Sequence, residues 1–269
     1  MAVMTCNYFS FVLKRNTTIN VFIPTPEGNE QITNENVKNH YRYKEGLPVV
    51  YLLHGAYGNY SSWSRFSNIE RYAQKHCCAL VMASADNNFY QDMYLGDAYH
   101  TFFTKELPEM VTNLFPISKK REDTYVAGFS MGGYGAWYLA LSNPDKYCKA
   151  ASMSGALDIA TLYEQSMANM IPGPFSWNQI FEHPEKLKGS KADLFRLYDD
   201  CVASGTVPEL YQACGTSDFL YESNCSVKER MEQRNANLVY REGEGGHTWD
   251  FWDEHIQYIL EWMFPLEKK

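Results

Sequence analysis

The stretch that decides the fold runs from Thr124 to Trp137 and reads TYVAGFSMGGYGAW. It places four glycines around Ser130, directly after an apolar run that is rich in strand-forming residues. The glycines are Gly128, Gly132, Gly133 and Gly135. Glycine weakens a strand or a helix interior by roughly 0.5 to 1 kcal/mol relative to alanine, so this clustering requires a geometric reason.

The spacing of the glycines supplies that reason. In the pattern G-x-S-x-G, a serine occupies a sharp strand-to-helix turn that lifts its hydroxyl above a sheet. We therefore predict that Gly128 and Gly132 give clearance for Ser130 at such a turn. Gly133 and Gly135 are predicted to let the following helix pack closely on the sheet.

Strand and helix patterns alternate along the rest of the chain. Two strand-like runs, YFSFVLKR and TINVFIP, predict an antiparallel hairpin whose turn lies at Asn16 and the two threonines after it. The run LPVVYLLHG is apolar without alternation, which is typical of a strand covered on both faces. Pro108 should kink or restart the helix expected over about 101–115. Further strands are expected at ALVMAS, TYVAGF, YCKAASMS, VPELYQACG and NLVYRE, and helices at about 64–76, 131–142, 227–235 and 249–264.

This alternation predicts the α/β class, with a mostly parallel central sheet and helices on both faces. We assign residues 1–269 to a single domain, because α/β folds commonly reach this length as one unit. Within it, residues 156–205 interrupt the alternation and are expected to form a small lid-like insertion. A polar stretch over 25–46 is expected to be a surface connection.

Composition limits the partners. The formal charge of −8 and the lack of a Lys/Arg-rich stretch argue against nucleic acid. No segment approaches the roughly 20 apolar residues of a membrane span, and the N-terminal stretch does not resemble a signal peptide. Seven scattered cysteines fit reduced thiols. We therefore expect a cytoplasmic protein with no membrane or nucleic-acid partner, and allow for a homo-oligomer.

The serine at the turn needs a base. A serine hydroxyl becomes a good nucleophile only when a histidine takes its proton and a third group orients that histidine. In the α/β-hydrolase arrangement the chain order is serine, acid, histidine. His247 follows the last expected strand, in EGEGGHTWDFW, and is predicted to be the base for Ser130. His183 and His255 are expected to be surface or packing residues.

Two aspartates compete for the role of the acid. Asp218, in ACGTSDFLYE, follows the penultimate strand, from which a carboxylate can meet the imidazole Nδ1 of His247. Asp158, in SMSGALD, also leaves the carboxyl end of a strand and stays open as a substitute. Asp250 and Asp253 fit the first turn of the closing helix, where they favour the positive end of its dipole. We predict Asp218.

An attacked carbonyl also needs donors for its developing negative oxygen. The residue after the nucleophile, Met131, is predicted to supply one backbone N–H. The turn after YLLH, in HGAYGN, is predicted to supply the other from Ala56. His54 precedes Ser130 in the chain, whereas the base of an α/β-hydrolase follows the serine, so we expect His54 to hold this turn instead.

Taken together, these motifs resemble the esterase D and tributyrin esterase branch of the α/β-hydrolases, which is related to the feruloyl and acetyl xylan esterases of carbohydrate esterase family one. The resemblance covers nearly the whole chain and rests on LLHGAYGN followed by Trp63, DNNFYQDM with FFTKELPEM, GFSMGGYGA, CGTSDFL and GGHTWDFW. It implies the α/β-hydrolase fold, a triad of Ser130, Asp218 and His247, oxyanion donors at Ala56 and Met131, and no metal or organic cofactor. The chain departs from formylglutathione hydrolases in its shorter, different insertion.

The function implied is a serine carboxylesterase that acts on short-chain acyl or hydroxycinnamoyl esters. Its partner would be a small-molecule ester, including acylated oligosaccharides, and aromatic residues near the motifs are the expected substrate contacts. These contacts are Trp63, Tyr90, Trp177 and Trp249. The alternatives on the same triad are an acyltransferase and an S-formylglutathione hydrolase-like thioesterase, and a more distant one is a non-catalytic binding module.

Overall fold

The computed structural model describes residues 1–26, 45–168 and 173–265. These residues form an eight-stranded sheet in the order β1-β2-β4-β3-β5-β6-β7-β8. The strands from β4 to β8 pair in parallel, and only the pairs β1–β2 and β2–β4 are antiparallel. The strands are β1 (Ala2–Ser10), β2 (Arg15–Ile23), β3 (Val49–Leu53), β4 (Ala79–Ala83), β5 (Thr124–Phe129), β6 (Lys149–Met153), β7 (Glu209–Gly215) and β8 (Leu238–Gly243). The predicted mostly parallel sheet is therefore confirmed.

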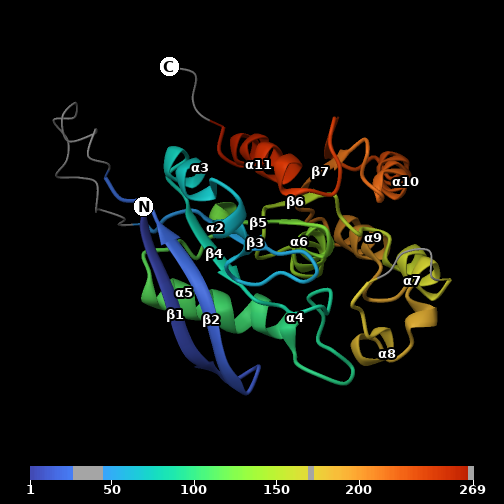
Figure 1. Cartoon of the computed structure of the whole chain (residues 1–269), viewed down its shortest axis with the longest axis horizontal. Coiled ribbons are helices and arrows are strands. Elements are labelled where there is room, and N and C mark those ends of the chain that lie inside the picture. The colour runs from blue at the N-terminus through green and yellow to red at the C-terminus, as the bar shows by residue number, and fades with distance from the viewer. Residues whose placement is uncertain (27–44, 169–172, 266–269) are drawn as a thin grey trace.

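The N-terminal hairpin lies at one edge of the sheet (Figure 1). Its turn differs from the prediction: Asn16 lies within β2, paired with Phe9, and the turn lies at 11–14. The reason is a contact with a residue that is distant in the sequence. The carboxylate of Glu106 accepts hydrogen bonds from the Ser10 hydroxyl and from the backbone N–H groups of Phe11 and Val12. A turn fixed by a residue about a hundred positions away leaves no local signal.

Helices cover both faces of the sheet, as predicted, because each central strand sends alternate side chains to opposite faces. In β3, Val49 and Leu53 pack in one apolar core and Val50 in another. The first core includes residues of α5, α6 and α9, and the second includes residues of α3 and α11. The helices are α2 (Ser62–Phe66), α3 (Ile69–Lys75), α4 (Tyr99–Thr101), α5 (Leu107–Leu114), α6 (Met131–Ser142), α7 (Ile159–Met167), α8 (Trp177–Ile180), α9 (Leu194–Ser204), α10 (Tyr221–Glu232) and α11 (Trp249–Met263).

Two expected helices are divided. The helix expected over 64–76 is α2 and α3, because the chain is extended at Ser67. The helix expected over 101–115 runs from α4 through a π-helical turn at Phe102–Glu106 into α5. The backbone angles stay helical at Phe102, Glu106 and Leu107, so Pro108 follows the π-helical turn inside a continuous run and does not restart the helix. The helix expected over 227–235 begins earlier, at Tyr221.

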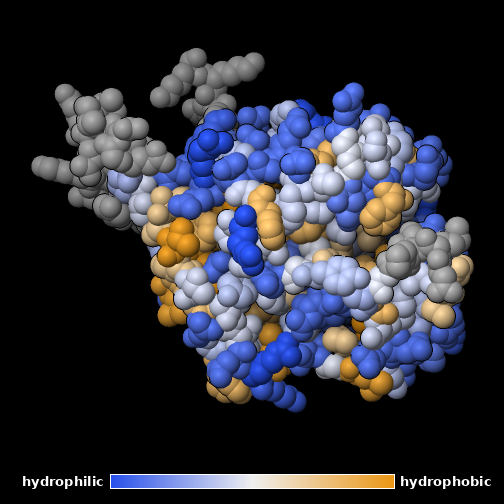
Figure 2. All heavy atoms as spheres, in the orientation of Figure 1, coloured by the Kyte–Doolittle hydropathy of each residue, from blue (hydrophilic) through white to orange (hydrophobic). Residues whose placement is uncertain are grey.

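Residues 156–205 hold α7, α8, a 3₁₀ turn at Pro184–Lys186, and α9, and residues 169–172 lie outside the described part. This insertion hydrogen-bonds to the loop after β4 through Tyr94 N–H to Ile180 O (3.0 Å) and Leu95 N–H to Gln179 O (2.8 Å). Most of the stretch expected as a surface connection, 27–44, also lies outside the described residues. Figure 2 shows that hydrophilic residues dominate the visible face and that apolar residues there form separate groups. In the described ranges, no helix has the length and apolar character needed to span a bilayer.

Candidate active site

Ser130 stands at the sharp turn between β5 and α6. Its backbone has φ 56° and ψ −124°, a conformation that L-residues rarely adopt. A Cβ atom on Gly128 would lie 2.2 Å from the Gly132 carbonyl oxygen, and one on Gly132 would lie 2.5 Å from the His54 carbonyl oxygen. Neither backbone oxygen can yield that space without moving the turn. The clearance predicted from the glycine spacing is therefore confirmed.

The next two glycines bring α6 close to its neighbours. A Cβ atom on Gly133 would lie 2.6 Å from the Ser152 hydroxyl of β6. A Cβ atom on Gly135 would lie 2.3 Å from the ring of Tyr90, which packs on the helix backbone at this point. The close packing on the sheet is confirmed for Gly133, whereas Gly135 gives room to the loop after β4 instead of the sheet.

Three side chains from three loops meet at the carboxyl edge of the sheet. His247 Nε2 lies 2.9 Å from the hydroxyl oxygen of Ser130. His247 Nδ1 lies 2.9 Å from Asp218 Oδ2 and 3.1 Å from Asp218 Oδ1. The Asp218 carboxylate is fully buried, whereas the imidazole is 20% exposed. Such a chain of contacts lets the imidazole take a proton from the hydroxyl while the carboxylate holds its other nitrogen.

The buried carboxylate keeps its charge. Burial by itself would raise the pKa of Asp218, but hydrogen bonding and charge from His247 act against it. The Leu220 backbone N–H, which donates to Asp218 Oδ1 at 2.9 Å, acts in the same direction. The result is a pKa below the ordinary value of an aspartate, so the group is an anion at neutral pH.

The competing residues have other partners. Asp158 caps α7 through the Thr161 N–H and forms an ion pair with Arg230 at 2.7 Å. His183 is exposed beside Glu185. These contacts explain why Asp158 is not available to orient an imidazole.

His255 lies on the inner face of α11. Its ring is buried and stacks on Phe251, with centroids 3.9 Å apart. This agrees with the packing role expected from the sequence.

His54 lies behind the turn that follows β3. The Ala85 backbone N–H donates to Nε2 of His54 (2.9 Å), so the ring carries its proton on Nδ1 and donates it to the Gly55 carbonyl (2.7 Å). Burial lowers the pKa of His54 to about 4, so the ring stays neutral at physiological pH. The Gly58 N–H donates to the same carbonyl at 3.1 Å.

These contacts fix one peptide plane. In a trans peptide the C=O and N–H groups point in opposite directions, so holding the Gly55 carbonyl aims the Ala56 N–H the other way. Ala56 and Met131 both line the cavity above Ser130. Among the described residues, neither of these two backbone N–H groups has a hydrogen-bond acceptor. Two free donors beside a serine hydroxyl are suited to a developing oxyanion.

Comparison with known proteins places this geometry in a family. The model of the Esterase family, described as "Putative esterase", matches residues 29–263. The chain belongs to this family. This esterase is 33% identical over 267 residues to an acetyl esterase of Caldicellulosiruptor saccharolyticus, with 98% of each chain covered.

Two solved structures from Staphylococcus aureus are also similar to this esterase, each at 29% identity with 98% of both chains covered. They are FphF, a fluorophosphonate-binding serine hydrolase, with a TM-score of 0.81, and the S-formylglutathione hydrolase FrmB, with a TM-score of 0.82. The family resemblance, the α/β-hydrolase fold and the serine esterase class predicted from the sequence are confirmed by these relatives.

The cavity of the esterase above Ser130 has a volume of about 420 Å³. Its described lining contains no Lys, Arg, Asp or Glu side chain. The aromatic lining residues are Tyr57, Phe66, Phe129, Phe175, Phe219, Trp249 and Trp252. A site of this kind favours an uncharged, apolar ligand, because a buried charge would find no partner in it.

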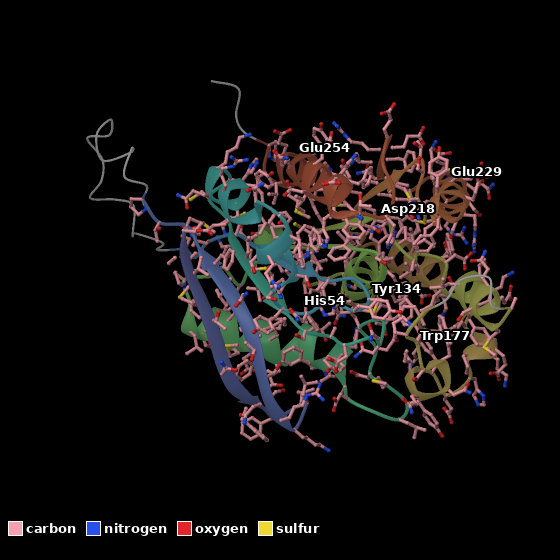
Figure 3. The ribbon with its side chains drawn as sticks, viewed as in Figure 1. His54, Tyr134, Trp177, Asp218, Glu229 and Glu254 are labelled. Carbon is pink, nitrogen blue, oxygen red and sulfur yellow. The ribbon has the colours of Figure 1, made fainter. Side chains whose placement is uncertain are left out.

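Of the four predicted substrate contacts, Trp249 alone is part of this lining. Trp63 is 1% exposed and donates from Nε1 to the Leu53 carbonyl, behind the cavity. Tyr90 is 0% exposed, and its hydroxyl donates to the His54 carbonyl. Trp177 is 6% exposed and packs on the ring of Phe89 and on rings within the insertion, where Figure 3 labels it. We therefore withdraw these three as direct substrate contacts of the esterase.

These three predictions failed because a motif in the sequence does not show whether a nearby aromatic side chain points into the cavity or into the core behind it. Trp63 and Tyr90 donate to the Leu53 and His54 carbonyls behind the cavity, and Trp177 packs against Tyr163 in the insertion. Trp252, which was not among the predicted contacts, lines the cavity and packs against the His247 ring with centroids 5.1 Å apart. The spacing of three residues between Trp249 and Trp252 was the available signal, since it places both on one helix face.

Proposed function

We propose that this esterase is a serine carboxylesterase that hydrolyses short-chain acyl or hydroxycinnamoyl esters through an acyl-enzyme. The observation that carries the proposal is the continuous hydrogen-bonded chain Asp218–His247–Ser130 at the floor of an uncharged aromatic cavity. The acid, base and nucleophile roles of these residues, and the oxyanion role of Ala56 and Met131, are part of the proposal.

Acylation begins at Ser130. As its hydroxyl oxygen attacks the ester carbonyl carbon, His247 Nε2 takes the hydroxyl proton, and the π electrons of the carbonyl move to its oxygen. Asp218 stabilises the imidazolium that forms, because its buried carboxylate contacts Nδ1. The oxyanion then collapses, the bond to the alcohol oxygen breaks, and His247 gives its proton to the departing alcohol.

Deacylation repeats these steps with water. His247 takes a proton from a water molecule, whose oxygen attacks the acyl carbon. The second oxyanion collapses, the bond to the Ser130 oxygen breaks, and that oxygen recovers its proton from His247. In both steps the Ala56 and Met131 N–H groups would donate to the negative oxygen, and loss of one such donor typically costs about 10²- to 10³-fold in kcat.

Residues of the insertion set the depth of the cavity. Phe175 lines it together with Leu162 of α7, and the Phe175 ring packs on Phe89 with centroids 4.4 Å apart. We propose that the segment 156–205 acts as a lid-like cover and that its aromatic side chains limit the length of the acyl group.

The experiment compares wild type with Ser130→Ala on p-nitrophenyl acetate. We expect kcat to fall by about 10⁶-fold, as when a nucleophilic serine is removed from a triad. Ser64→Ala is the matched control, because Ser64 donates only to the Ser61 carbonyl and lies outside the cavity lining. Near-normal turnover in Ser130→Ala, or a wild-type enzyme that a fluorophosphonate fails to label, would refute the proposal.

A thioesterase acting on S-formylglutathione is the second candidate, because the Staphylococcus aureus relative of that name is 29% identical. Glutathione carries carboxylates and an ammonium group, for which the described cavity lining offers no charged partner. We therefore expect kcat/KM for p-nitrophenyl acetate and methyl ferulate to exceed that for S-formylglutathione. Release of free acid in the presence of added sugar would distinguish hydrolysis from acyl transfer.

The substrate source and cellular setting of the enzyme are also part of the proposal. An acylated oligosaccharide fits as a substrate because sugars are uncharged and stack on aromatic rings. A cytoplasmic location, a homo-oligomer and the lack of a nucleic-acid partner stay predictions from composition. Subcellular fractionation and the mass of the protein in solution test the first two.

A further inference from the structure

The stretch DNNFYQDM, from Asp86 to Met93, follows β4 and contributes no reacting group to the proposed mechanism. Its beginning has an unusual backbone, with φ +45° at Asp86, +55° at Phe89 and +59° at Tyr90. The left-handed region is unfavourable for residues with a Cβ atom, and such conformations persist where surrounding contacts require them. The contacts of residues 86–90 therefore indicate what the strained segment provides.

Core contacts make this segment a rigid support. Phe89 and Tyr90 are both 0% exposed, and the Tyr90 ring fills the space that Gly135 leaves on α6. At the other end, the Asp86 carboxylate accepts a hydrogen bond from the hydroxyl of Tyr99, a residue that is 1% exposed. The backbone is therefore fixed on both sides of the intervening residues 87 and 88.

One side chain of the segment reaches the turn that follows β3. The side-chain oxygen of Asn87 accepts the backbone N–H of Tyr57 at 2.8 Å. Tyr57 directly follows Ala56, the proposed oxyanion donor, and its own backbone is left-handed, with φ +65°. Asn87 is not among the residues that line the cavity above Ser130. Its hydrogen bond therefore acts on the backbone of the turn and not on a substrate in that cavity.

The contact from Asn87 complements the one from His54, because the Cα atom of Ala56 joins two peptide planes. The first plane carries the Gly55 carbonyl and the Ala56 N–H, and His54 holds it at that carbonyl (2.7 Å). The second plane carries the Tyr57 N–H, and Asn87 holds it there. Each plane is stiff, so rotation about the N–Cα bond of Ala56 would break one of the two hydrogen bonds. Together they keep the Ala56 N–H aimed at the cavity.

We propose that Asn87 is a positioning residue of the oxyanion hole, whose side-chain oxygen fixes the turn that presents the Ala56 N–H. The strained segment 86–90 provides the fixed backbone from which this oxygen reaches the turn. An oxyanion donor is most effective when it does not have to reorient as the charge develops, and the restraint supplies this condition. This inference rests on the proposed function, because it assigns a role within the same site.

Ser84 provides a matched control. Its hydroxyl oxygen accepts the backbone N–H of Tyr60 at 3.1 Å, so it links the same two parts of the chain with the same kind of hydrogen bond. Tyr60 lies further along the chain from Ala56 and is not part of the cavity lining. Ser84→Ala therefore removes a comparable contact without freeing the peptide planes on either side of Ala56.

The test measures Asn87→Ala, Asn87→Asp and Ser84→Ala on p-nitrophenyl acetate. Asn87→Ala should lose about 10-fold in kcat with KM little changed, because a donor worth about 10²- to 10³-fold is no longer held in position. Asn87→Asp keeps an oxygen on a side chain of the same length and should recover most of this loss. Affinity for a trifluoromethyl ketone, whose adduct with Ser130 carries a negative oxygen, should fall in Asn87→Ala by the same factor as kcat/KM. Ser84→Ala should resemble wild type in both measurements.

A second readout does not depend on turnover. The NMR order parameters of the Ala56 and Tyr57 backbone N–H groups should fall in Asn87→Ala, toward the values below about 0.6 that mark a flexible backbone, but not in Ser84→Ala.

Three results would overturn the proposal. They are unchanged kcat and order parameters in a folded Asn87→Ala, equal losses in Asn87→Ala and Ser84→Ala, and an Asn87→Asp variant no more active than Asn87→Ala. If wild type shows no turnover that depends on Ser130, the proposed function fails, while the order parameters still test whether Asn87 fixes the turn.

Discussion

Lowering the pH is expected to destabilise this esterase through one buried side chain, the imidazole of His54. The neutral ring accepts the Ala85 N–H on Nε2 and donates from Nδ1 to the Gly55 carbonyl. A protonated ring would place an N–H against the Ala85 N–H in a site with almost no solvent. Burial therefore lowers the pKa of His54 from 6.5 to about 4.

The size of the effect follows from the two pKa values. As the pH falls below 6.5, the unfolded chain binds a proton at His54, whereas the folded chain binds it only near pH 4. Stability from this group is thus complete above the unfolded pKa and is lost as the pH falls toward about 4. Because one pKa unit corresponds to about 1.4 kcal/mol, the loss in unfolding free energy is about 3 kcal/mol.

The assay is urea unfolding of wild type and His54→Asn between about pH 7 and about pH 4. Asparagine does not titrate, so the variant keeps every other pH-dependent group, including His76, His100 and His255, whose pKa values are also lowered, chiefly by burial. The variant is less stable at neutral pH, because the Ala85 N–H loses its acceptor, and the comparison therefore uses the change with pH. Wild type should lose about 3 kcal/mol more than His54→Asn over this interval. Parallel curves for the two proteins would refute the reasoning.

Three further outcomes are expected. Gly132→Ala should lose most of its activity and about 1–3 kcal/mol of unfolding free energy, because its Cβ would lie 2.5 Å from a backbone oxygen. The control Gly243→Ala, whose Cβ would lie 3.4 Å from its nearest atom, should resemble wild type in turnover and urea midpoint. Asp218→Asn should lower kcat by about 10⁴-fold. Asp158→Ala should keep kcat and lose about 1 kcal/mol of unfolding free energy with its helix cap. The reverse pattern would show that Asp158 and not Asp218 is the acid that orients His247. Wild type should hydrolyse p-nitrophenyl acetate faster than the octanoate ester. Phe175→Ala should raise the relative rate on octanoate, because it enlarges the cavity. A wild-type preference for octanoate would show that the lid does not limit the length of the acyl chain.

Local patterns predicted much of the fold. The alternation of buried strands with amphipathic helices fixed the α/β class, and β5 and α6 begin and end where the sequence places them. The hairpin turn at 11–14 could not be predicted in the same way, because Glu106 holds it across the fold. The break between α2 and α3 likewise has no Pro or Gly to announce it.

The site was predictable where chemistry limits the choice of residues. A nucleophilic serine needs small neighbours, and its base and acid must follow in a fixed order, which selects Ser130, His247 and Asp218 from few candidates. Substrate contacts carry no such limit, since an aromatic residue serves equally in a core or in a cavity wall. Trp63 and Trp249 both lie close to the predicted motifs, yet only Trp249 lines the cavity.

The sequence by itself determined the order of strands and helices, the tight turn and the three side chains that we propose as the triad, because these depend on residue type and near spacing. Only the tertiary structure decided which aromatic side chains form the cavity and which groups hold the turn at Ala56. Asn87 and Tyr57 lie 30 positions apart in the chain and meet only because β3 and β4 pair side by side. Side-chain direction and contacts between distant segments arise from packing, which no local pattern records.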